Sequence, residues 1–133
     1  ALINYLNKKR EHKHSLFIYG SLTTPIHAVN LSSTIQTIYD TIPNPYIIAI
    51  DASLGSKDHI SHVTLGQGSL SPGIGVNKQL PAVGDAFITG IVNSCDHGSR
   101  GITLQTTRLA TVIELSNFIT RGILYSLKQT GYL

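Results

Sequence analysis

The sequence predicts an α/β fold with a mostly parallel sheet, and three observations lead to this prediction. Residues 46–50 form an apolar run with three isoleucines, which is typical of a strand buried on both faces of a parallel sheet. Residues 16–50 contain a strand pattern, a helix pattern and this second strand in succession, the order of a right-handed βαβ unit. From Thr106 onward, apolar residues recur at helical spacing up to a stop signal at Gly131, which predicts a long helix packed across the sheet.

Length and composition describe one globular domain, residues 1–133. The chain is 41% hydrophobic and 13% charged, and it is long enough to bury a core. Lys and Arg exceed Asp and Glu by only 10 to 7, which is too small an excess to predict a nucleic-acid partner. The single cysteine, Cys95, can form neither an internal disulfide nor a structural zinc site, which fits a reducing cytoplasm. No apolar run approaches the roughly 20 residues that cross a bilayer, so we expect no membrane partner.

Local signals predict the elements of the first half. Residues 1–10 have the pattern of a helix end, and the basic cluster that follows is typical of a solvated helix terminus. Residues 16–19 form a short apolar strand closed by Gly20. Asn30 is the expected N-cap of a helix that ends before Pro43.

The second half contains two further predicted strands around a loop. Residues 59–65 alternate, which places His59 and His62 on opposite faces of a strand and makes them a poor metal pair. Residues 66–84 form one long loop, and its glycines match neither a dinucleotide fingerprint nor a Walker loop. A loop of this length is more often functional than connective. Residues 86–93 predict another largely buried strand.

Asp51 is the leading candidate for chemistry because it directly follows the buried strand predicted at residues 46–50. In an open α/β sheet the carboxyl ends of the strands form the ligand crevice. The alternative is that Asp51 only accepts backbone N–H groups at a turn or helix start. The strand at residues 86–93 delivers Asn93, Asp96 and His97 toward the same crevice. Asp96 is therefore the candidate second acid and His97 the candidate proton carrier, with solvated loop residues as the alternative for both.

Six stretches carry a more specific signal. In chain order they are residues 19–30 (YGSLTTPIHAVN), 48–55 (IAIDASLG), 72–75 (PGIG), 80–85 (LPAVGD), 88–93 (ITGIVN) and 104–109 (LQTTRL). Together they resemble the YyaC (DUF1256) family of sporulation proteins from spore-forming Firmicutes. That family resembles the germination protease of spores, an atypical aspartic-type endopeptidase, and more distantly the hydrogenase maturation endopeptidases. The resemblance implies a three-layer α/β/α sandwich of the phosphorylase/hydrolase-like type, in the cytoplasm of the sporulating cell or forespore.

The resemblance also implies a site built on two acids. Asp51, in its Asp-Ala context, matches the acid that ends a buried strand in the germination protease. The other acid belongs to a Gly-Asp-(Ser/Ala)-Leu-Gly-Pro type of segment that would precede Ala1. We therefore expect the domain to be N-terminally incomplete, without its first strand and its glycine-rich acid loop. The residues expected to shape the substrate cleft are Gly66, Gly68, Pro72, Gly73, Gly75 and Asn93.

The resulting hypothesis is a sporulation-associated, aspartic-type peptidase acting on a protein or peptide, such as a spore protein. Of two neighbouring carboxyl groups, one stays protonated while the other acts as a base toward water, so no cofactor is required. One alternative is a non-catalytic peptide- or partner-binding protein on the same fold. Another is a maturation-endopeptidase-like protein that binds a divalent metal such as nickel through Asp51 and either His97 or His62. The sheet edge left by the missing strand predicts marginal stability or pairing of the chain into a homo-oligomer.

Overall fold

The computed structural model describes residues 16–72, 80–94 and 107–133. The predicted helix end at residues 1–10 lies outside these ranges, as do Gly73, Gly75, Cys95, Asp96 and His97. Among the helices in the described ranges, none combines the length and the apolar character that crossing a bilayer requires.

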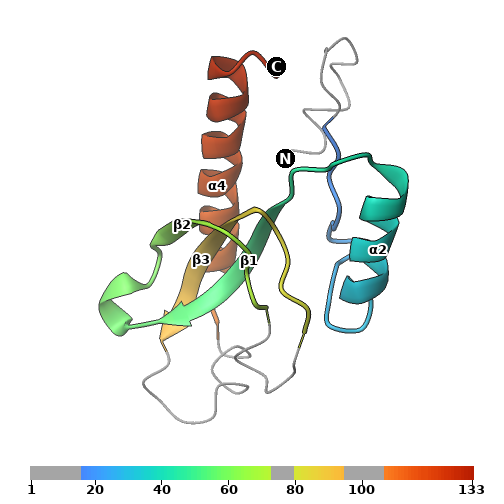
Figure 1. Ribbon diagram of the computed structural model, residues 1–133. Helices are drawn as coiled ribbons and strands as arrows, with labels where there is room; N and C mark the ends of the chain where they lie inside the picture. The colour runs from blue at the N-terminus through green and yellow to red at the C-terminus, as the bar shows by residue number, and fades with distance from the viewer. Residues whose placement is uncertain (1–15, 73–79, 95–106) are drawn as a thin grey trace.

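The described elements form a mixed α/β fold (Figure 1). In chain order they are α2 (Leu31–Thr41), β1 (Ile48–Gly55), the 3-10 helix η1 (Lys57–His59), β2 (Val63–Gln67), β3 (Ala86–Ser94) and α4 (Leu109–Gln129). The strands form one small sheet in the order β1-β3-β2, in which β1 is parallel and β2 antiparallel to β3. The helix α4 packs against β3, and α2 lies to the side of β1 (Figure 1). The α/β class is confirmed, whereas a three-layer sandwich with a mostly parallel sheet is not.

Residues 16–19 do not form the predicted strand. Leu16 and Phe17 are 44% and 55% exposed, and the segment has no partner among the described strands. A strand persists only where a neighbouring edge satisfies its backbone N–H and C=O groups. The predicted βαβ unit is therefore reduced to α2 and β1, and the parallel pair of the sheet is β1 with β3.

The strand β1 is longer than predicted and lies at an edge of the described sheet. It continues through residues 52–55 because they find register partners along the nine-residue β3. Ile48 and Ile50 are 48% and 52% exposed, so the prediction of a strand buried on both faces is wrong. The reason is its position in the sheet, since β3 is the strand with neighbours on both sides.

The strand β2 begins later than predicted. Lys57–His59 form η1, and the chain then turns at Ser61, which has a φ of +71°. His59 and His62 therefore precede β2. The prediction that these two histidines lie on opposite faces of a strand is wrong.

The loop predicted at residues 66–84 is shorter than expected. Its first two residues belong to β2, and Leu70 pairs with Val83 through two backbone hydrogen bonds of 2.8 Å. Just after the loop, the Ile47 N–H donates to Asp85 Oδ2 and the Asp85 N–H donates to the Ile47 carbonyl, both at 2.8 Å. These bonds fix the chain immediately before β3 against the chain immediately before β1.

The helix α4 is the long helix that the sequence predicts. Its Leu115 is 5% exposed and lies over Gly90 of β3, where an added Cβ would come 3.3 Å from the Leu115 side chain. Gly131 ends the helix as predicted, with a φ of +74°. The Tyr132 N–H donates to the Leu127 carbonyl at 2.8 Å, which is the hydrogen bond of a Schellman-type helix end.

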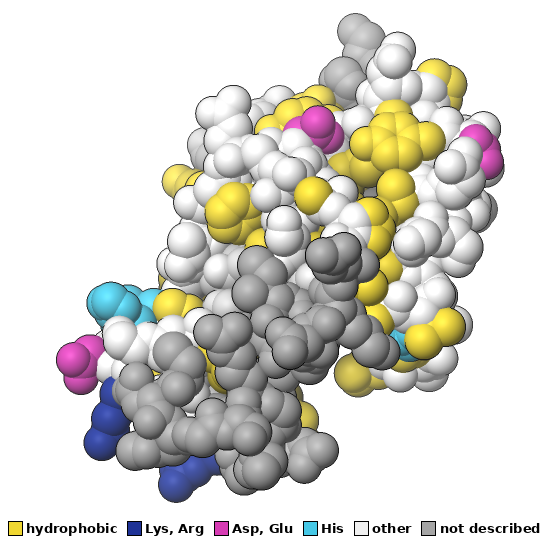
Figure 2. Space-filling view, turned by 60° about the horizontal axis from the view of Figure 1, so that its bottom comes forward, with side chains coloured by type: hydrophobic (Ala, Val, Ile, Leu, Met, Phe, Trp, Pro, Cys, Tyr) yellow, Lys and Arg dark blue, Asp and Glu magenta, His cyan; other side chains and the backbone are white. Residues whose placement is uncertain are grey.

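The described core is small. Its buried hydrophobic residues are Leu31, Ile38, Ala49, Val92 and Leu115. Many large apolar side chains remain exposed, and Figure 2 shows hydrophobic side chains gathered over the upper part of one face. Within the described ranges, the contribution of hydrophobic burial to the free energy of unfolding therefore comes from few side chains.

Candidate functional site

Asp51 lies in the middle of β1, so its predicted placement just after a strand is wrong. It is the fourth of eight strand residues, and its register partner on β3 is Thr89. The carboxyl end of β1 lies at Gly55 instead. The apolar run in the sequence marks only the first part of this strand, because the second part is stabilised by pairing with β3 rather than by its own composition.

The surroundings of the Asp51 carboxyl group favour its protonated form. The residue keeps contact with solvent, but the protein packed around it removes part of its hydration, and this raises its pKa above the ordinary value. The Ala52 N–H donates to Asp51 Oδ1 at 2.8 Å and partly opposes this effect by stabilising the charged form. Neither influence involves a second charged side chain. Asp51 is therefore a carboxyl group that holds its proton more readily than a free aspartate does.

A polar row continues from Asp51 across the sheet. Asp51 pairs with Thr89 of β3, and Thr89 pairs with Thr64 of β2. Register partners direct their side chains to the same face of a sheet, so these three residues share one face. Thr89 is only 8% exposed. The row therefore presents a carboxyl group at the β1 edge, with a buried hydroxyl group behind it.

A cavity of about 270 Å³ lies between β1, β3 and α4, next to Asp51. Its lining is mostly apolar. The lining residues are Ile50, Asp51, Ala52, Gly90, Val92, Val112, Leu115, Ser116, Ile119, Thr120 and Ile123. The volume falls just below the roughly 300–1,000 Å³ that is typical of small-molecule sites. The mostly apolar lining suits an apolar group of a ligand, such as one side chain.

The other described candidate residues are spread along the sheet and do not gather around Asp51. Gly66 lies in β2, opposite the amino-terminal part of β3, and Gly68 and Pro72 follow β2. Asn93 lies at the opposite end of β3, next to its last residue. The structure therefore does not bring these residues to one crevice, and their role in substrate binding stays a prediction.

Two of these residues have structural reasons for their type. A Cβ added at Gly66 would overlap the ring of Phe87, so only glycine leaves room for this ring. Asn93 Oδ1 accepts the Ser94 N–H at 2.9 Å, and Asn93 Nδ2 donates to Thr107 Oγ1 at 3.4 Å. Asn93 thereby connects the end of β3 to the segment that leads into α4.

The metal alternative is not assembled by the described residues. Asp51 is in β1 and His62 directly precedes β2, and β3 lies between these two strands. Two strand spacings amount to about 10 Å, so the backbones that carry the two residues are far apart for one metal ion. His97 lies outside the described residues, and the nickel alternative stays a prediction.

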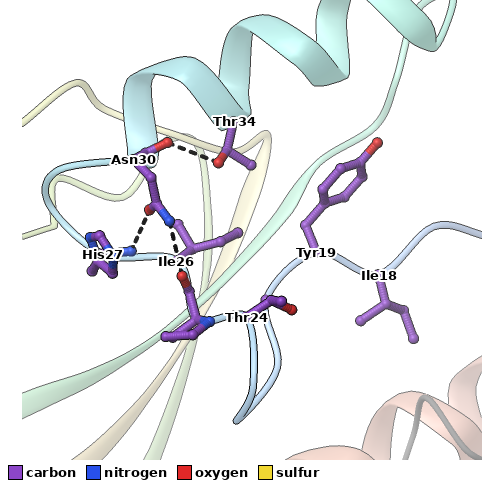
Figure 3. A pocket seen from close by; sticks show the side chains of 9 residues that line it. Ile18, Tyr19, Thr24, Ile26, His27, Asn30 and Thr34 are labelled. Atoms are coloured by element: carbon purple, nitrogen blue, oxygen red, sulfur yellow. Dashed lines mark hydrogen bonds between the residues drawn. The ribbon is translucent and has the colours of Figure 1, made fainter.

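A second hollow, of about 490 Å³, lies between the loop at residues 20–30 and the start of α2 (Figure 3). Asn30 organises its polar wall. Asn30 Oδ1 accepts the His27 N–H at 2.8 Å, and Asn30 Nδ2 donates to the Pro25 carbonyl at 3.0 Å. Asn30 precedes α2 as predicted, but its side chain turns back to the loop and makes no capping hydrogen bond to the helix. The two hydrogen bonds of the Asn30 side chain, drawn in Figure 3, therefore hold this loop in shape.

Comparison with known proteins relates the chain to a family. The family model described as "Protein of unknown function (DUF1256)" matches residues 4–122. The chain is also 42% identical, over 106 residues, to the "Uncharacterized protein YyaC" of Bacillus subtilis (strain 168), an alignment that covers 80% of this chain and 51% of that protein. The chain belongs to the DUF1256 family. No solved structure matches it.

Membership in the DUF1256 family confirms the assignment that the six sequence stretches predict. The family is described as being of unknown function, and the chain spans about half the length of the curated relative that it matches. All the predicted site residues fall within residues 4–122. The activity of this DUF1256 protein, its substrate and its partners are therefore matters for proposal.

Sequence reasoning did not identify two features of the described residues. The pairing of Asp51 with Thr89 depends on strand register, for which the sequence carries no local signal. The contact between the rings of His59 and His62 was missed because the predicted strand begins too early. The adjacent Asp58 and Lys57, which disfavour a strand, are the local signal that could have moved this boundary.

Proposed function

We propose that the chain is part of a sporulation-associated, aspartic-type peptidase that hydrolyses a peptide bond in a spore protein, with Asp51 as one of two catalytic carboxyl groups. The observation that carries this proposal is the raised pKa of Asp51, which results from loss of hydration in the middle of β1. A two-acid mechanism needs one carboxyl group that keeps a proton while its partner is ionised. The resemblance of the chain to a family related to the germination protease supplies the reaction class.

The chemistry requires a second carboxyl group, which would lie outside the described residues. Asp96 is the candidate within this chain, and an acid in the segment expected before Ala1 is the candidate in a longer protein. The ionised group would accept a proton from water as the water attacks the peptide carbonyl. The protonated group would donate its proton to the leaving amine. The raised pKa of Asp51 favours the donor role for this residue.

The edge position of β1 supports an extended peptide as the substrate. Among the described strands, β1 pairs with β3 alone, so its other edge faces no described strand. An extended peptide can add to such an edge as a further strand and place alternate side chains in pockets. The cavity beside Ile50 and Ala52 has the size and the apolar lining for one such side chain. Asp51, between these two residues, would then lie beside the added backbone.

A non-catalytic peptide-binding protein is the second candidate, because the same edge and cavity can hold a peptide without cleaving it. This function needs no second acid and no proton transfer. Among the described residues, the two candidates differ in what they require of Asp51. Binding tolerates an amide at this position, whereas hydrolysis does not.

The test is cleavage of a small acid-soluble spore protein by the full-length protein and by two paired variants, Asp51→Asn and Asp85→Asn. Asp85 is the matched control because its Oδ2 accepts the Ile47 N–H, a hydrogen bond that an amide oxygen also accepts. We expect Asp51→Asn to abolish cleavage while it retains substrate binding, and we expect Asp85→Asn to retain both. Cleavage by Asp51→Asn at the wild-type rate would refute the catalytic role of Asp51. A full-length protein that binds the substrate but cleaves it at no pH would refute the peptidase and support the binding protein.

A further inference from the structure

Two histidines meet at the turn between β1 and β2, away from Asp51. His59 is the last residue of η1 and His62 directly precedes β2, and both side chains are exposed. Their ring centroids are 5.5 Å apart, and the ring planes are inclined by 68°. The chain therefore places two imidazoles side by side at an accessible position.

Hydrogen bonds to the Nδ1 atoms leave the Nε2 atoms of both rings available. His62 Nδ1 lies 3.4 Å from the Ile60 carbonyl oxygen, and because a carbonyl only accepts, this nitrogen carries the proton. His59 Nδ1 lies 2.9 Å from Ser56 Oγ, which can accept a hydrogen bond from it in the same way. An imidazole that donates through Nδ1 has its lone pair on Nε2. Histidines that bind metals in proteins are commonly oriented by such a hydrogen bond.

The ring separation suits coordination of one ion. With a metal–nitrogen bond of about 2.0–2.1 Å, an imidazole centroid lies roughly 3.2 Å from its metal, so two centroids 5.5 Å apart correspond to an angle of about 120° at the ion. This angle is close to that of a tetrahedral or trigonal site. The two rings are therefore near enough for one ion to reach both, provided that the exposed side chains turn their Nε2 atoms toward it.

The backbone of the turn is held in place before any ion binds. The His59 N–H donates to the Ser56 carbonyl and the His62 N–H to the His59 carbonyl, each at 3.0 Å. The Ser61 N–H donates to the Ile91 carbonyl at 2.8 Å, and this bond anchors the turn to β3. Little backbone conformational entropy therefore remains to be lost when the two rings bind one ion.

We propose that His59 and His62 form a two-imidazole site for a divalent transition metal, with Zn²⁺ as the reference ion. Imidazole nitrogen suits Zn²⁺, Ni²⁺ and Cu²⁺ and does not suit Mg²⁺ or Ca²⁺. The described residues contain no group of three or more metal-binding side chains, so the proposed site takes two protein ligands from the described part of the chain. This site is separate from Asp51 and does not depend on the proposed peptidase activity.

The test is titration of the purified chain with Zn²⁺ by isothermal calorimetry, together with electron paramagnetic resonance of the Cu²⁺-loaded chain. We expect the chain to bind one Zn²⁺ ion at this site and the Cu²⁺ spectrum to show two coordinated nitrogens. In His59→Ala and in His62→Ala, the affinity for Zn²⁺ should be lower by about tenfold or more. Ser56→Ala should weaken binding less, because it removes only the group that orients His59. Mg²⁺ should give no signal.

Two controls separate this site from three of the other four histidines of the chain. His27→Ala removes an exposed histidine whose Nδ1 accepts the Val29 N–H at 3.3 Å, and it should leave Zn²⁺ affinity unchanged. A double variant of His12 and His14 should also leave it unchanged. Equal losses in these controls, or wild-type affinity in both His59→Ala and His62→Ala, would overturn the proposal. Circular dichroism confirms that each variant is folded, so that a loss of binding is assigned to the site.

Discussion

Asp51 and Thr89 are register partners in the parallel pair of β1 and β3, and each lies near the middle of its strand. This pairing places the one described carboxyl group with a clearly raised pKa beside a buried hydroxyl group. Its position differs from the strand-end crevice that is usual in open α/β sheets. A ligand of Asp51 would therefore approach along the edge of β1 rather than over the strand ends.

Asp51→Asn should stabilise the chain at neutral pH. The pKa of Asp51 in the folded chain lies above its ordinary value of 3.8, which applies to the unfolded chain. Between these two pKa values the folded chain binds more protons than the unfolded chain, so the free energy of unfolding falls as the pH rises through this range. The neutral amide has no such loss. We expect a gain of less than about 1 kcal/mol at pH 7, because solvent screens this exposed residue.

The measurement for this variant is urea unfolding of both proteins between pH 3 and pH 8. The difference in the free energy of unfolding should disappear below the ordinary pKa of Asp51. A variant that is less stable than the wild type at pH 7 would contradict the raised pKa.

Gly66→Ala should destabilise the chain by about 1–3 kcal/mol, because the new methyl group overlaps the ring of Phe87. Phe87→Leu should relieve part of this cost, so the double variant should lose less stability than the two single variants added together. Gly68→Ala is the control. It has no neighbour within 4 Å but has a φ of +96°, so its cost is one of backbone strain that Phe87→Leu does not relieve. Strict additivity of Gly66→Ala and Phe87→Leu would argue against the ring contact.

Gly122→Ala should stabilise the chain by about 0.5–1 kcal/mol. Gly122 lies inside α4, and a Cβ added there meets nothing within 4 Å, so alanine gains helix propensity without a clash. Gly131→Ala is the paired control, since that position is equally open but has a φ of +74°. Thermal unfolding should show a higher midpoint for the first variant and a lower one for the second. The reverse order would contradict the placement of these glycines.

The edge of β1 should cause the chain to associate as its concentration rises. Ile48 is 48% exposed on this edge strand, and Ile48→Lys should reduce association because a charged side chain blocks edge-to-edge pairing. Tyr125→Lys on α4 is the control, since Tyr125 is 66% exposed but lies on no strand. Sedimentation velocity at several concentrations measures the effect. A wild-type chain that is a cooperatively melting monomer at all of them would refute this prediction.

The sequence predicts well those elements whose signal is local. The apolar period of α4, its stop at Gly131 and the apolar run of β3 all identify the element without knowledge of the rest of the fold. The elements that were predicted wrongly depend on partners distant in sequence. Residues 52–55 form a strand because they pair with β3. Residues 16–19 do not form a strand because they pair with no described strand.

The same distinction applies to the site. Asp51 stands out in the sequence because a lone acid ends an apolar run, and the structure gives this residue an altered pKa. Its pairing with Thr89 and the ring contact between His59 and His62 could not be predicted. The first depends on strand register and the second on a turn that interrupts an alternating pattern. Strand register leaves no local mark in the sequence, whereas Lys57 and Asp58 disfavour a strand and are a local sign of the turn.

The most direct test of the role of Asp51 is a pH titration of its carboxyl group by carbon-13 nuclear magnetic resonance, with the signal assigned by its loss in Asp51→Asn. A midpoint above the ordinary value of 3.8 is expected, because loss of hydration outweighs the hydrogen bond from Ala52. Such a midpoint would support a carboxyl group that keeps a proton for transfer. A midpoint at or below 3.8 would show that Asp51 is an ordinary ionised aspartate, and it would remove the observation on which the proposed peptidase rests.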